Sequence, residues 1–194
     1  MLSNNVNYIN RLIAFGIFLL TFIVYFDTMA PTVSYWDCGE FIATSFILGV
    51  PHPPGSPLYL LLGRIFSMIP TNPDIAFRVN IISPIVSAVA CMLLYLIIVK
   101  IILRWRGKIK NNTDLLIVFG GALVGSLTFA FTDSHWFNAV EAEVYAMSTF
   151  FTAIVVWLIL LWSENADNDG SERYILIIAY MFGLAIGCLL YTSD

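Results

Sequence analysis

The sequence predicts an all-α protein, a polytopic transmembrane helix bundle. Of its 194 residues, 59% are hydrophobic and only 11% are charged. A soluble domain carries roughly 45–50% apolar and about 25% charged residues, so this composition indicates lipid as the solvent. Several apolar stretches also approach or exceed the roughly 20 residues that a helix needs to cross about 30 Å of hydrocarbon.

Five apolar stretches are predicted to span the membrane. The first, residues 12–28, is longer than the usual signal-peptide core and lacks a small-residue cleavage site after it, so we interpret it as a retained helix. The others are residues 76–103, 115–131, 144–162 and a stretch from Tyr174 into the end of the chain. The third span contains Gly120, Gly121 and Gly125, which would let another helix approach closely.

Two shorter segments are predicted to lie along the membrane surface. Residues 58–69 are apolar, but the stretch contains Arg64 and is only about a dozen residues long, which suits an interfacial segment better than a span. Residues 36–50 alternate polar and apolar positions in a way that suits a helix lying in the interface. We therefore expect the first long loop to rest on the bilayer.

Basic residues predict the orientation. Five of the nine Lys and Arg fall within residues 100–110, and short loops rich in Lys and Arg stay in the cytoplasm. With alternate crossings, the loops 31–74 and 132–143 then both face the non-cytoplasmic side, and the polar turn 163–173 faces the cytoplasm. The basic cluster follows an apolar run and is typical of a topology signal, so we expect no nucleic-acid partner.

The first outer loop carries the strongest candidates for chemistry. Asp37 and Glu40 are three residues apart and would share one face of a helix. Ionisable groups at a lipid boundary are expensive to desolvate and commonly have a function; a solvated surface helix with two acids is the alternative. Residues 50–59 contain four prolines, which stiffen the backbone that presents His52. A rigid connector with a surface histidine is the corresponding alternative.

The second outer loop adds Glu141 and Glu143, which would diverge on a helix, so that one could face the site and the other water. Arg64 and Arg78 are the cations predicted on this side. Their guanidinium groups offer the fork of donors that suits a lipid phosphate, whereas snorkelling or pairing with loop acids is the alternative. No cofactor is required by these motifs, but the paired acids could hold Mg²⁺ or Mn²⁺.

These motifs together resemble those of the bacterial relatives of the transmembrane protein O-mannosyltransferases, a family long described only as an uncharacterised membrane domain. The resemblance covers nearly the whole chain. It rests on W-D-C-G-E-F (36–41), G-V-P-H-P-P-G-S-P-L-Y (49–59), R-V-N (78–80) and A-V-E-A-E-V-Y-A (139–146).

The resemblance implies a GT-C type glycosyltransferase. Such enzymes move a sugar, here expected to be mannose, from a polyprenyl-phosphate carrier to an acceptor such as a protein Ser or Thr hydroxyl on the non-cytoplasmic face. The acidic catalytic position in the first outer loop corresponds to Asp37, with Glu40 beside it. We expect the substrate to contact the remaining candidates, namely His52, Arg64, Arg78, Glu141 and Glu143.

We expect residues 1–194 to form a single membrane domain, the N-terminal part of a longer protein, because family members are usually longer and residues 188–194 depart from the family pattern. The resemblance implies a bacterial inner membrane with the site facing the periplasm. A polytopic transporter would also place ionisable groups at membrane depth, but here the acids cluster in outer loops. A non-catalytic assembly subunit is the third possibility.

Overall fold

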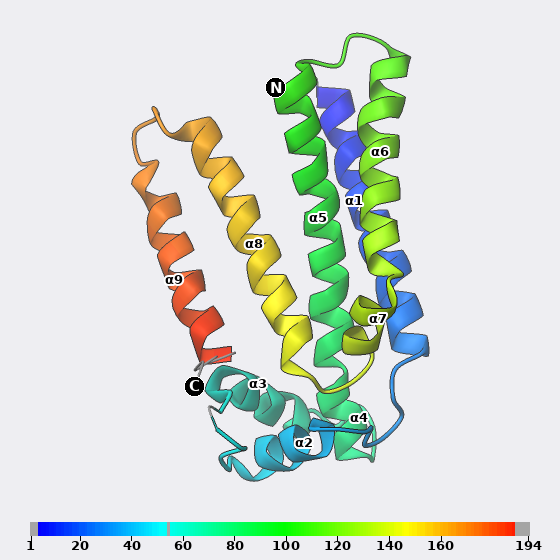
Figure 1. Ribbon diagram of the computed structural model, residues 1–194, viewed down its shortest axis with the longest axis vertical. Coiled ribbons are helices and arrows are strands. Elements are labelled where there is room, and N and C mark those ends of the chain that lie inside the picture. Colours follow the sequence, from blue (N-terminus) through cyan, green and yellow to red (C-terminus); the bar gives the residue numbers. More distant parts are fainter. Residues whose placement is uncertain (1–3, 54, 189–194) are drawn as a thin grey trace.

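The computed structural model describes residues 4–53 and 55–188, and within them the only regular secondary structure is helical. The long helices run roughly side by side, and shorter helices lie across one end of the bundle (Figure 1). In chain order the described helices are α1 (Asn4–Asp27), α2 (Cys38–Ile47), α3 (Pro57–Met68), α4 (Ile75–Asn80), α5 (Ile82–Arg106), α6 (Asn112–Ala130), α7 (Asp133–Ala139), α8 (Val144–Asn165) and α9 (Glu172–Cys188).

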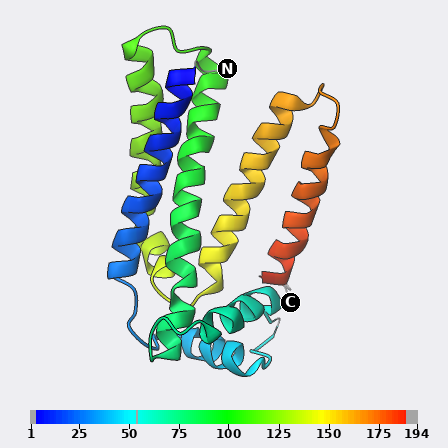
Figure 2. The ribbon, with the colours of Figure 1, turned by 180° about the vertical axis from the view of Figure 1, so that it is seen from behind.

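Four helical segments are long and apolar enough to cross a membrane: Asn5–Asp27, Ile75–Arg106, Asn112–Ala130 and Val144–Asn165. The prediction of an all-helical, polytopic bundle is therefore confirmed. Helix α9 runs alongside α8 (Figures 1 and 2) and spans 17 described residues. The predicted fifth span continues into residues 189–194, which lie outside the described part of the chain, so it stays a prediction.

The second predicted span is divided into two helices. Helices α4 and α5 are separated at Ile81, just before Pro84, which lacks the backbone N–H that would bond to the carbonyl of Asn80. Helix α4 packs against α2 and α3 at one end of the bundle (Figure 1). A segment that hydropathy reads as one span therefore contributes its first turns to the site.

The two ends of the bundle differ in composition. One end carries the start of α1, the α5–α6 loop and the α8–α9 loop; the other carries α2, α3, α4 and α7 (Figures 1 and 2). We call these the basic end and the site end, because residues 100–110 lie at the first. Residues 31–74 and 132–143 thus share one end, as alternate crossings require. Which side of the membrane this end faces stays a prediction.

Helices α2 and α3 pack as a pair across the site end and occupy the two segments predicted to be interfacial. Tyr59 of α3 is fully buried, with its ring centroid 5.6 Å from that of Phe41 of α2. A Cβ added at Gly63 would collide with the Ser45 side chain. This glycine therefore permits the close approach of the two helices.

Glycines also allow close packing between α5 and α6. A Cβ built at Gly125 would lie 3.0 Å from Ile98 Cδ1, and one at Gly121 would lie 3.7 Å from Ile102 Cδ1. A Cβ at Gly120 would meet no atom within 4 Å. The predicted role in helix approach therefore belongs to Gly121 and Gly125.

Candidate functional site

Asp37 stands at the exposed start of α2. Trp36, immediately before it, has φ of +59°, a left-handed conformation that is strained for a bulky residue. The backbone carbonyl of Asp37 accepts the first bond of the helix from Phe41 N at 2.9 Å, while its side chain makes no capping bond. The carboxylate of Asp37 is exposed and forms no hydrogen bond or ion pair within residues 4–53 and 55–188.

A buried asparagine fixes the segment between α1 and α2. The Asn80 side chain is fully buried, and its Nδ2 donates to the carbonyl oxygens of Ala30 at 2.8 Å and Thr32 at 3.0 Å. The backbone N–H of Ala30 donates to the Val140 carbonyl at 2.8 Å, which ties this segment to the second loop. Asn80 belongs to the R-V-N motif, but no role was predicted for it from the sequence.

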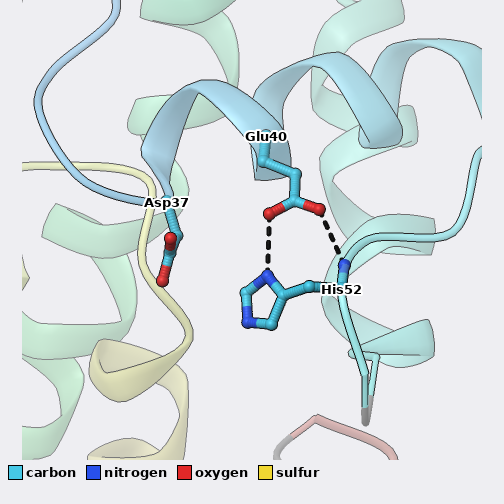
Figure 3. A group of neighbouring side chains, drawn as sticks. All are labelled: Asp37, Glu40 and His52. Atoms are coloured by element: carbon cyan, nitrogen blue, oxygen red, sulfur yellow. Dashed lines mark hydrogen bonds and ion pairs between the residues drawn. The ribbon is translucent and has the colours of Figure 1, made fainter.

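Glu40 and His52 form a two-point pair (Figure 3). The His52 backbone N–H donates to Glu40 Oε1 at 2.7 Å, and the imidazole Nδ1 lies 2.7 Å from Glu40 Oε2. The side-chain hydrogen bond raises the pKa of His52 and lowers the pKa of Glu40, so it favours the charged forms of both. Both side chains are partly exposed, and solvent weakens their attraction.

Asp37, Glu40 and His52 together make what we call the exposed cluster. One ligand atom from each lies within 4.8 Å of the others. Figure 3 shows the Asp37 carboxylate apart from the Glu40–His52 pair, with no bond to it. The structure thus brings together the three residues that the sequence predicted from the first outer loop.

A second group, the buried cluster, comprises Cys38, Glu141 and Glu143, whose ligand atoms also lie within 4.8 Å of one another. Cys38 Sγ donates to Glu143 Oε1 at 3.8 Å, and the Ser34 hydroxyl donates to Glu141 Oε2. Within the described residues, Oε1 of Glu141 is buried without a hydrogen-bond partner. Burial, followed by the charges of Glu141 and Asp37, raises the pKa of Glu143 to about 7.

The expectation that Glu141 and Glu143 would diverge, one of them toward water, is wrong. Glu141 is 3% exposed and Glu143 is 7% exposed. The reason is local: helix α7 ends at Ala139 and α8 begins at Val144, so the two acids lie in an irregular link and not on a helix. The Glu143 N–H donates to the Glu141 carbonyl at 2.9 Å, and both side chains turn inward.

Cys38 and Ser34 had no predicted role, yet each holds a buried carboxylate. Cys38 lies two positions before Glu40, so on α2 the two side chains point in opposite directions. That offset could have indicated that Cys38 faces the interior while Glu40 faces outward. No local pattern could have paired Ser34 with Glu141, which lies 107 residues further along the chain.

Arg64 and Arg78 bond to backbone carbonyls. Arg64 Nη1 donates to the Phe46 carbonyl at 2.5 Å, and the guanidinium lies 5.4 Å from the Phe46 ring centroid. Arg78 donates to the carbonyls of Asn72 at 2.5 Å and Ser67 at 2.9 Å. The Arg64 bond ties α3 to α2, and the Arg78 bonds tie α4 to α3 and to the turn before α4. A contact of either arginine with a lipid phosphate stays a prediction.

Either cluster offers donors for a divalent cation. Mg²⁺ favours oxygen ligands and retains several waters, and Mn²⁺ likewise suits carboxylate ligands. The exposed cluster offers the carboxylates of Asp37 and Glu40 to Mg²⁺ or Mn²⁺, with the His52 imidazole beside them. The buried cluster has two carboxylates and a thiol. Because a thiol is a soft ligand, this set suits a softer cation, which would be held away from solvent. Metal binding stays a prediction.

A comparison with protein families identifies the family of this chain. Residues 37–192 match the model of the protein O-mannosyl-transferase TMEM260 N-terminal domain. The chain belongs to this family. The matched range begins at Asp37 and includes every residue of the exposed and buried clusters. The resemblance to protein O-mannosyltransferases inferred from the motifs is therefore confirmed at the level of the family.

Two curated relatives support the assignment to the TMEM260 N-terminal domain family. Protein O-mannosyl-transferase tmem260 of Dictyostelium discoideum is 30% identical over 161 residues, which cover 81% of this chain and 18% of that protein. Protein O-mannosyl-transferase TMEM260 of Mus musculus is 26% identical over 159 residues, which cover 82% of this chain and 21% of that protein. The chain thus spans about a fifth of these relatives. No solved structure matches it.

Proposed function

We propose that this chain carries the catalytic loop of a membrane protein O-mannosyltransferase of the GT-C type. The reaction would move mannose from a polyprenyl-phosphate carrier to a Ser or Thr hydroxyl on the non-cytoplasmic face, which in a bacterial cell is the periplasmic face of the inner membrane. The names of the two relatives support the transferase class. The observation that carries the proposal is the free, exposed carboxylate of Asp37 beside the Glu40–His52 pair.

The proposed chemistry is a direct displacement. A Ser or Thr hydroxyl is a weak nucleophile until a positioned base takes its proton, and the Asp37 carboxylate would accept it. The hydroxyl oxygen then forms the new bond to the anomeric carbon. The bond from that carbon to the phosphate oxygen breaks, and the carrier leaves as the polyprenyl phosphate with the electron pair. A single displacement inverts the anomeric configuration.

His52 is well placed to assist the leaving phosphate. Glu40 orients the imidazole and favours its protonated form. With no cation bound in the exposed cluster, an imidazolium next to the reacting centre would stabilise the negative charge that develops on the phosphate. Because Arg64 and Arg78 are held by backbone carbonyls, His52 is the cation we expect to meet this charge first.

The test uses the full-length protein, labelled polyprenyl-phosphate mannose and a Ser/Thr acceptor peptide. Asp37→Asn should lower the turnover rate by about 10²–10⁴, as removal of a general base does. Asp133→Asn is the matched control, since Asp133 is exposed at the same end but belongs to neither cluster. Normal turnover by Asp37→Asn at matched expression would remove Asp37 from the mechanism.

Two assays on the same full-length protein, sugar transfer and solute flux, distinguish the enzyme from the transporter and the assembly subunit. Solute flux in liposomes without sugar transfer would favour the transporter. Neither transfer nor flux would favour a non-catalytic assembly subunit. Adding and chelating Mn²⁺ in the transfer assay tests the predicted cation, because a metal-dependent reaction would stop with chelator and resume with the ion.

A further inference from the structure

A cavity with several charged lining residues opens at the basic end, between α1, α5 and α8. Its volume is about 710 Å³, within the roughly 300–1,000 Å³ of small-molecule pockets. Both ribbon views show α8 leaning away from α5 toward this end (Figures 1 and 2). The charged residues that line it are Arg11, Lys100, Arg104, Lys108 and Glu164. We call it the basic cavity.

Two of the four cations already have partners. Lys100 Nζ lies 2.5 Å from Glu164 Oε2 and 5.0 Å from the Trp157 ring centroid. Arg104 Nη1 donates to the Ser163 hydroxyl at 3.0 Å. These contacts connect α5 to the end of α8 and fix one wall of the cavity. Glu164, the single carboxylate among the described lining residues, is thus already paired with Lys100.

The other two cations have none. In residues 4–53 and 55–188, the side chains of Arg11 and Lys108 form no hydrogen bond or ion pair, although both line the cavity. Asn10 lines it as well, and its Oδ1 is buried without a partner among the described residues. The cavity therefore presents two unpaired positive charges, which could bind an anion, and one unpaired acceptor, which could accept a hydrogen bond from a hydroxyl. A ligand with both groups would match it.

We infer that the basic cavity binds the headgroup of an anionic, hydroxyl-bearing phospholipid, with the phosphate at Arg11 and Lys108 and a headgroup hydroxyl at Asn10. Leu96, Val99 and Leu103 supply an apolar wall beside the charges, as the glycerol and first methylenes of a lipid require. Basic pockets between membrane helices bind such headgroups. The site lies at the other end of the bundle from the two acidic clusters and is separate from the proposed catalysis.

The test is lipid binding to the 194-residue chain in detergent, followed by native mass spectrometry. We expect tight retention of phosphatidylglycerol and weak retention of phosphatidylcholine. Each cation near an anionic lipid changes affinity by about five-fold, so Arg11→Gln with Lys108→Gln should weaken phosphatidylglycerol binding by about 25-fold. The double variant should keep its melting temperature, because neither side chain has an internal partner.

The matched control is Lys110→Gln with Arg173→Gln, which removes the same charge from the same end outside the cavity. Equal losses in both double variants would overturn the assignment, since they would reflect only general surface charge. Equal retention of phosphatidylglycerol and phosphatidylcholine by the unaltered chain would also overturn it, whether or not the variants fold.

Two further measurements define the ligand. If millimolar inorganic phosphate raised the melting temperature as much as phosphatidylglycerol, the site would be one for a soluble phosphate and the assignment to lipid would fail. Asn10→Ala should reduce the preference for phosphatidylglycerol over phosphatidic acid, which has no headgroup hydroxyl. An unchanged preference would overturn the placement of the hydroxyl.

Discussion

Replacing Glu143 by Gln should change how the stability of this protein depends on pH. Glu143 is 7% exposed and stands at the N-cap position of α8, where its side chain makes no capping hydrogen bond. Burial and the neighbouring acids raise its pKa to about 7 from the ordinary value of 4.5. The folded protein therefore binds this proton more tightly than the unfolded chain does. Ionisation of Glu143 opposes folding.

The sign and size follow from that difference. Stability should fall as the pH rises from about 4.5 and level off above about 7, because only the folded state still holds the proton in that window. Each pH unit between the two values changes the folding free energy by about 1.4 kcal/mol, so the complete effect is about 3 kcal/mol. Gln mimics the protonated form and cannot ionise, so the stability of the variant should not fall as the pH rises through this window.

The assay is thermal unfolding of both proteins in the same detergent between pH 4 and pH 8.5. The melting temperatures should nearly coincide at the acid limit, and the variant should exceed the unaltered protein by about 6–12 °C above pH 7, on the scale of domains of this size. Glu172→Gln is the control, because Glu172 is exposed and is the first residue of α9, which begins at the α8–α9 loop. A constant difference between the Glu143→Gln variant and the unaltered protein across the pH range would refute the reasoning.

Three further predictions concern the site and the helix packing. Glu40→Gln should lower the pKa of His52 toward its ordinary value of 6.5, because the side-chain hydrogen bond from Glu40 raises it. NMR titration reads this directly, since the chain has two histidines and the other is buried; an unmoved midpoint would mean that the pair does not form. Asn80→Leu should destabilise the protein by about 1–3 kcal/mol, because two backbone carbonyls after α1 lose their donor, and an unaltered melting temperature would contradict those bonds. Gly125→Val should cost about 1–3 kcal/mol by overpacking against α5, whereas Gly120→Val should not; similar melting temperatures for the two variants would disprove this packing.

Local patterns were sufficient for the helical architecture and for the exposed cluster. Hydropathy identified the four long segments that the structure contains as helices, since the length of apolar sequence needed to cross a bilayer is fixed by its thickness. The three-residue spacing of Asp37 and Glu40, with the stiff proline loop before α3, was enough to group these acids with His52. Both predictions rest on residues that are close in the sequence, within one helix or one loop.

The sequence by itself therefore determined that this chain is a membrane helix bundle with an acidic first loop, and its motifs indicated the family. Only the tertiary structure decided that Glu141 and Glu143 are both buried, that Ser34 and Cys38 hold them, and that Arg11 and Lys108 share a cavity. Those relations join residues about a hundred positions apart. Hydropathy and periodicity report which face of one element is apolar, whereas burial and pairing depend on which other element packs against it.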